Sequence, residues 1–127
     1  MIVIDTSAWI EYFLGSLRGR QVQGLMVVEK RLATPAIVLV ELACKFFRDG
    51  VDFTTHVEYI RKNSEILGLD DVDILSIARN YAKMKVASGN KSSLSDAIIF
   101  TAAESYGAVV VTCDSDFQGL AGVRVIH

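Results

Sequence analysis

Met-Ile-Val-Ile-Asp-Thr-Ser-Ala-Trp (Met1–Trp9) decides the fold, because within it a strand signal runs directly into a helix signal. Ile2–Ile4 have the length and the β-branching of a buried strand. Asp5 follows at once, and Thr6 and Ser7 are both good N-terminal caps for a helix. This order places the Asp5 carboxylate at the carboxyl edge of a sheet, where open α/β sheets bind ligands. Alone at that edge, Asp5 is equally well explained as a cap or turn residue; among other carboxylates it is a metal ligand.

The rest of the chain alternates between helix and strand signals. After a first helix that ends near Gly15, further strands are expected at Leu32–Thr34, Glu65–Leu69, Ala108–Thr112 and Val123–Ile126. Helices are expected at Ser16–Lys30, Pro35–Arg48, Thr54–Asn63, Asp70–Val86 and Leu94–Tyr106, with Thr34 and Asp70 as caps. Strands separated by helices form parallel sheets with right-handed crossovers. We therefore predict a three-layer α/β/α sandwich around a five-stranded parallel sheet.

Composition places the chain among globular proteins, since 51% of its 127 residues are hydrophobic and 22% are charged. Nothing in it resembles a linker, so residues 1–127 are predicted to form a single domain. Its 13 Lys and Arg against 15 Asp and Glu give a net charge of −2, which disfavours a general nucleic-acid coat protein. The same balance is compatible with a nuclease whose acidic centre offsets basic rims.

Cys44 and Cys113 fit no zinc or redox spacing, and we interpret them as reduced, mostly buried small residues. The N-terminus has no basic leader followed by an apolar segment, and no apolar run approaches the roughly 18 residues of a membrane span. We therefore expect a cytoplasmic protein that has no membrane partner.

Glu41 stands out among the acids, because every other residue of Ala36–Cys44 is apolar. Such a helix is expected to be buried around most of its circumference. A carboxylate inside it is costly unless a cation or a metal ion pairs with it. Lys45, one turn further on, is one possible partner. A bound metal ion is the other.

Three more acids lie near the ends of predicted helices and strands. Asp96 comes three residues after Ser93, which matches a capping box, and on its own it is best explained as a first-turn acid. Asp114 and Asp116 directly follow a Val-rich strand. Two acids so close together repel each other unless something positive sits between them. Thr112 is placed to add a hydroxyl oxygen.

Four separated segments thus supply acids that can share one edge of the sheet. Hard oxygen ligands favour Mg²⁺ or Mn²⁺ over zinc, and such an ion can activate water and stabilise the charge that develops on a phosphodiester. By contrast, Asp70, Asp71 and Asp73 cluster at a helix start and are interpreted as partners of its dipole. His56 is interpreted as a solvated helix residue, and His127 ends the chain. No phosphate-binding loop or nucleophile elbow supports an NTPase or a serine hydrolase.

The acid-bearing motifs, in their order along the chain, resemble those of the PIN-domain ribonucleases, and in particular of the VapC toxins of toxin–antitoxin pairs. They are Ile4–Ser7, Thr34–Glu41, Leu94–Ala97 and Val111–Phe117. The resemblance implies a sheet of order 3-2-1-4-5, in which the first and fourth strands are neighbours and bring Asp5 beside Asp114.

The same resemblance implies an acidic site around Mg²⁺ or Mn²⁺. Its catalytic residues are Asp5, Glu41, Asp96 and Asp114, of which Asp5, Asp96 and Asp114 hold the metal; Asp116, Ser7 and Thr112 are accessory residues. Basic residues that guide the RNA backbone are expected among Lys45, Lys91 and either Arg18 or Arg20. The implied products of cleavage carry a 5′-phosphate and a 3′-hydroxyl.

The function that the resemblance implies is hydrolysis of RNA by a metal-dependent endoribonuclease, the toxin of a VapBC-type pair. Its implied partners are a second copy of the chain and a cognate antitoxin whose tail covers the acidic pocket. The apolar set Trp9, Tyr12, Phe13 and Leu17 is either core or a groove for such a partner. The alternative is a non-catalytic or housekeeping PIN domain that binds or processes RNA.

Overall fold

Strand β1 (Ile2–Ile4) is the central strand of the computed structural model, which describes residues 1–127. The other strands are β2 (Leu32–Pro35), β3 (Glu65–Leu67), β4 (Val109–Thr112) and β5 (Val123–Val125). The helices are α1 (Thr6–Leu14), α2 (Leu17–Val28), α3 (Ala36–Arg48), α4 (Thr54–Asn63), α5 (Ile74–Ser88) and α6 (Leu94–Ser105), with short 3₁₀ turns η1 (Leu69–Asp71) and η2 (Ser115–Phe117). None of these helices combines the length and the apolar character that crossing a membrane requires.

The five strands form one parallel sheet in the order β3-β2-β1-β4-β5, which confirms the predicted topology. Ile2 aligns with Val109 and Ile4 with Val111, so the segments that leave β1 and β4 start side by side. The backbone N–H of Asp5 donates to the carbonyl oxygen of Val111 at 3.2 Å. The carboxyl end of β1 is therefore tied directly to that of β4.

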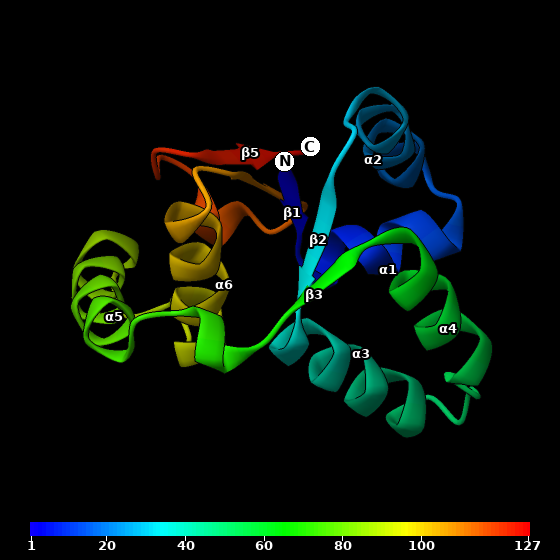
Figure 1. The fold of residues 1–127 in the computed structure, drawn as a ribbon, viewed down its shortest axis with the longest axis horizontal. Coiled ribbons are helices and arrows are strands. Elements are labelled where there is room, and N and C mark those ends of the chain that lie inside the picture. The colour runs from blue at the N-terminus through cyan, green and yellow to red at the C-terminus, as the bar shows by residue number, and fades with distance from the viewer.

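Helices cover both faces of the sheet, as a three-layer sandwich requires. In Figure 1, α5 and α6 lie on one side of the sheet, and α1, α2 and α4 lie on the other. Helix α3 leaves the carboxyl end of β2 and contacts both α1 and α6. All of β1 is buried, and Trp9 is the largest of the fully buried side chains. Trp9 is therefore core, whereas Leu17 of the same apolar set is 75% exposed.

The predicted caps of α3 and α5 are wrong. Asp73 caps α5 by accepting from the backbone N–H of Ser76 at 3.2 Å, whereas Asp70 lies in the preceding 3₁₀ turn. Thr34 is the third residue of β2 rather than the cap of α3, and its Oγ1 accepts from Trp9 Nε1 at 3.1 Å. The hydroxyl that the sequence pattern assigns to a helix terminus is used to satisfy a buried indole.

Helix α3 is buried on one face only, so the prediction that most of its circumference is buried is wrong. Val38 and Leu42 are fully buried, but Val40 is 56% exposed and Phe47 is 87% exposed. Cys44 is exposed as well, contrary to its interpretation as a buried residue. The reason is visible in Figure 1, where α3 runs away from the sheet and only its inner side faces other elements.

His56 is packed among aromatic rings rather than solvated, which corrects its interpretation from sequence. The ring centroid lies 4.7 Å from that of Phe13 and 4.8 Å from that of Phe46. The Nδ1 atom of His56 is buried and has no hydrogen-bond partner. The apolar side of α4 therefore includes this residue.

Helices α1 and α2 approach each other closely at Gly19. A Cβ atom placed on Gly19 would lie 1.9 Å from the carbonyl oxygen of Glu11. Ser16 caps α2 by accepting from the N–H of Gly19 at 3.0 Å. The absence of a side chain at Gly19 therefore lets the first turn of α2 lie directly against α1, and this turn carries Arg18.

Candidate active site

Asp5 lies at the centre of the candidate site, and its carboxylate is held on both oxygens. Oδ2 accepts from the Thr112 hydroxyl at 2.6 Å, and Oδ1 accepts from the Ser7 hydroxyl at 2.9 Å and from the Ala8 N–H at 3.0 Å. The bond from Ala8 makes Asp5 the N-cap of α1, so the expectation that Thr6 or Ser7 caps this helix is wrong. Asp5 is both a cap and a member of the acidic cluster.

Burial has a large effect on the acidity of Asp5, which is only 4% exposed. Desolvation raises its pKa to about 6, against the opposing effect of the hydrogen bonds from Thr112, Ala8 and Ser7. The negative charge of Asp114 adds to the rise. A carboxylate that is buried and still close to another acid is typical of a site that binds a cation.

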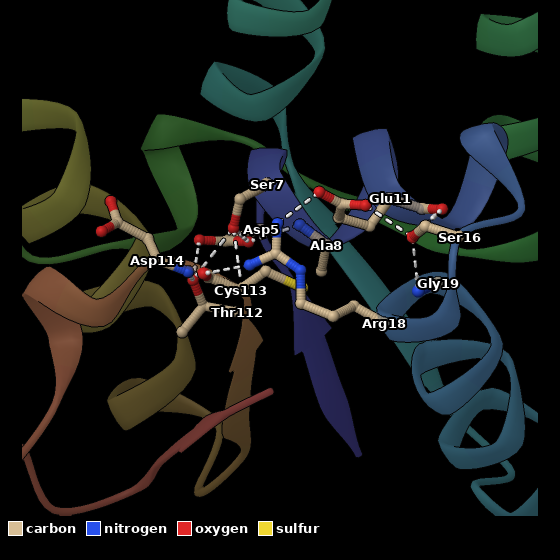
Figure 2. A network of polar contacts seen from close by, with 10 residues as sticks. All are labelled: Asp5, Ser7, Ala8, Glu11, Ser16, Arg18, Gly19, Thr112, Cys113 and Asp114. Carbon is tan, nitrogen blue, oxygen red and sulfur yellow. Dashed lines mark hydrogen bonds and ion pairs between the residues drawn. The ribbon is translucent and has the colours of Figure 1, made fainter. Parts of the chain in front are cut away.

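Ser7 and Thr112, the predicted accessory residues, connect β1 to the turn after β4. Their hydroxyl oxygens lie 3.1 Å apart. Ser7 Oγ accepts from the Cys113 N–H at 2.9 Å, and Thr112 Oγ1 accepts from the Asp114 N–H at 2.9 Å. Figure 2 shows this network between the two strand ends. The two hydroxyl groups thus fix the backbone that carries Asp114 relative to Asp5.

Glu41 reaches the same edge from α3 and is held by hydroxyl groups rather than by a cation. Oε1 accepts from the Thr6 hydroxyl at 2.7 Å, and Oε2 accepts from the Ser95 hydroxyl at 3.2 Å. Lys45 instead pairs with Asp49, at 3.2 Å, so the ion pair that the sequence offers for Glu41 does not form. Sequence reasoning misses Thr6 and Ser95 as site residues, although each directly adjoins one of the predicted acids.

Asp96, Asp114 and Asp116 complete the acidic cluster. Asp96 and Ser93 form the expected capping box, with Ser93 N–H to Asp96 Oδ2 at 2.9 Å and Asp96 N–H to Ser93 Oγ at 3.1 Å. Burial raises the pKa of Asp96, the bonds with Ser93 oppose the rise, and the charges of Asp114 and Asp116 add to it. Asp114 Oδ1 also accepts from the Asp116 N–H at 2.9 Å. Asp96 therefore shares an electrostatic environment with both acids after β4.

The donor set of this cluster suits a divalent cation. None of its five acids takes part in an ion pair with Lys or Arg, and carboxylate and hydroxyl oxygens are the ligands that Mg²⁺ and Mn²⁺ prefer. No three of the chain's acidic, His or Cys side chains converge closely enough to hold an ion among themselves. Water ligands would therefore have to complete the coordination of a bound ion, as they usually do for Mg²⁺.

The predicted substrate lysines are not hydrogen-bonded to the acids. Lys45 lines a pocket of about 330 Å³ with Phe13, Phe46 and His56, and its ammonium is paired with Asp49. Lys91 is exposed and forms no ion pair. Their proposed contact with RNA therefore stays a prediction.

The raised pKa of Asp5 predicts that the metal-free protein loses stability as the pH rises. Asp5 titrates at about 6 when folded, against an ordinary value of 3.8. Between these values the folded state holds a proton that the unfolded chain has released, which corresponds to about 3 kcal/mol in total. In EDTA, we expect the stability of the wild type to fall by about this amount relative to Asp5→Asn between about pH 4 and pH 7. Urea denaturation at each pH measures it, and a difference that does not change with pH would contradict the prediction.

Comparison with known proteins identifies the family. The sequence matches the PIN domain over residues 2–123. It is 31% identical to the VapC ribonuclease Mb1587 of Mycobacterium bovis and to the ribonuclease VapC11 of Mycobacterium tuberculosis, in each case over 97% of this chain and 93% of the relative. Its fold is similar to that of a chain in a toxin–antitoxin complex from Klebsiella pneumoniae, with a TM-score of 0.73, 21% identity, and coverage of 100% of this chain and 98% of that chain. The chain therefore belongs to the PIN-domain family, among the VapC ribonucleases.

Proposed function

We propose that this protein is a Mg²⁺- or Mn²⁺-dependent endoribonuclease and the toxin of a VapBC-type toxin–antitoxin pair. The observation that carries the proposal is the contact between Asp5 and the end of β4. There a buried carboxylate of raised pKa lies among acids that form no ion pair with Lys or Arg. Membership of the VapC ribonucleases supports RNA as the substrate. We also propose that it acts on RNA in the cytoplasm.

In the proposed mechanism, Asp5, Asp96 and Asp114 hold the metal, directly or through water. When bound, the ion lowers the pKa of a water ligand and stabilises negative charge on the phosphate. Asp5 contributes a fixed orientation, because Thr112 and Ser7 hold its two oxygens. The role proposed for Glu41, whose two oxygens accept from hydroxyl groups, is to orient the attacking water and accept its proton. In-line attack of this water on phosphorus breaks the bond to the 3′ oxygen, which takes a proton from solvent, so one product carries a 5′-phosphate and the other a 3′-hydroxyl.

The proposal is tested by RNA cleavage with and without divalent metal. We expect the purified wild type to cut RNA with Mg²⁺ or Mn²⁺, and cleavage to fall to the background rate in EDTA and return when the metal is restored. Asp70→Asn is a suitable control, since this exposed acid lies in η1 and makes no hydrogen bond through its side chain. Cleavage that is unchanged in EDTA would contradict metal dependence. No cleavage under any metal would favour a PIN domain that only binds RNA.

The partner proposals rest on the relatives. A chain of similar fold belongs to a solved toxin–antitoxin complex. We propose that this chain also binds a cognate antitoxin and forms a homodimer. Co-expression with the protein encoded beside it in the genome should restore growth to cells that the active chain inhibits. Light scattering of the purified protein should give the mass of a dimer, and a monomer at micromolar concentration would contradict the homodimer.

A further inference from the structure

Arg18 is the basic side chain that the fold holds at the active-site edge. Its Nη2 donates to Glu11 Oε1 at 2.5 Å, and its Nη1 donates to the carbonyl oxygen of Cys113 at 3.3 Å. Cys113 lies between Thr112 and Asp114, in the turn that carries the acids after β4. Figure 2 shows the guanidinium between this turn and Glu11.

The position of Arg18 is set by the packing of α2 on α1. Ser16 caps α2 and also donates to Glu11 Oε2 at 2.5 Å, so Glu11 is fixed on both oxygens. These contacts hold the pKa of Glu11 below its usual value, with the Ser16 bond as the largest cause. Gly19 allows the close approach of the two helices. A fixed, ionised Glu11 therefore orients the guanidinium before any ligand binds.

Arg18 keeps the capacity to bind an anion despite these two contacts. A guanidinium has five N–H donors in a planar fork, and two are used here. The side chain is 41% exposed, whereas that of Glu11 is only 16% exposed. Arg18 is thus the more exposed member of the pair, and its contact with Cys113 holds it next to the turn that carries Asp114 and Asp116.

We propose that Arg18, and not Arg20, binds a backbone phosphate of the RNA next to the point of cleavage. This inference rests on the proposed ribonuclease function and goes beyond it by naming the group that receives the substrate. Arg20 is exposed, two residues further along α2, and takes part in no ion pair. Residues two apart on a helix do not share a face, so Arg20 serves as a matched control of equal charge.

The test measures RNA binding by fluorescence anisotropy at several salt concentrations, in an Asp96→Asn background that we expect to prevent cleavage. We expect Arg18→Ala to weaken binding of a labelled single-stranded RNA by about tenfold. The slope of log affinity against log salt should fall by about 0.7, the value of one lost phosphate contact. Arg20→Ala should change affinity by about twofold or less. Arg18→Lys should keep the salt slope but not the full affinity, because it keeps the charge and loses the fork.

Two results would overturn the inference. Equal affinities and salt slopes for Arg18→Ala and Arg20→Ala would mean that Arg18 receives no phosphate. In the active background, a loss in kcat with unchanged KM and unchanged RNA affinity would make Arg18 a positioning residue for the Cys113 turn. Wild-type protein that neither binds nor cuts RNA would instead contradict the proposed function, so the two failures are distinguishable. Circular dichroism of each variant verifies that the fold is retained.

Discussion

Asp5→Asn is expected to lower the rate of RNA cleavage by a factor on the order of 10³, while the fold is retained. The substitution removes the buried charge at the point where β1 and β4 meet. Metal-bound charge stabilisation contributes several kcal/mol to such reactions, and each 1.36 kcal/mol corresponds to about tenfold in rate. Single-turnover cleavage of a labelled RNA with Mg²⁺ measures the effect.

The structure explains why Asn at this position should preserve the fold. Asn is as good a helix N-cap as Asp, and its amide oxygen can still accept from the Ala8 N–H that now binds Oδ1. The substitution also removes a charge that burial destabilises. The metal-free variant should therefore be at least as stable as the wild type at pH 7. Cleavage at the wild-type rate by a folded Asp5→Asn protein would rule out Asp5 as a metal ligand.

Gly19→Ala is expected to destabilise the protein by about 3 kcal/mol, the upper part of the usual range for overpacking. The new Cβ atom would lie 1.9 Å from the backbone oxygen of Glu11, and a backbone atom of α1 cannot turn aside as a flexible side chain can. Helix α2 has to shift, at the cost of the Ser16 bonds to Gly19 and Glu11. The same shift would displace Arg18 from the site edge.

Gly24 provides the matched control for this substitution. It lies in the same helix, is exposed, and has no neighbouring atom within 4 Å of the position that a Cβ atom would take. Gly24→Ala should therefore stabilise the protein by about 0.5–1 kcal/mol, the ordinary gain in helix propensity. Urea denaturation of both variants measures the contrast. Equal free energies of unfolding for the two variants would show that α1 and α2 tolerate a wider separation.

The order of helices and strands can be predicted from the sequence because its signals are local. Three β-branched residues before Asp5 predict β1, and the Val-rich run before Asp114 predicts β4. The strand order follows from the resemblance to PIN domains, and it is the adjacency of β1 and β4 that unites acids more than a hundred residues apart.

Other features depend on tertiary contacts that a single sequence does not display. The cap of α1 falls on Asp5 rather than on Thr6, whose hydroxyl binds Glu41 from another helix. The apolar stretch around Glu41 predicts an enclosed helix, yet α3 extends past the sheet and leaves Val40 exposed. Arg18 and Arg20 are indistinguishable in sequence until the partners of α2 are known.

The double use of Asp5 restricts how a protein of this kind can lose its activity through evolution. The side chain that starts α1 is also a member of the acidic site, so drift at this position is limited to residues that still accept a hydrogen bond from the first turn. Asn, Ser and Thr meet that requirement, and apolar residues do not. A descendant that has replaced Asp5 and kept the first turn of α1 would therefore be expected to carry a residue of this kind at position 5.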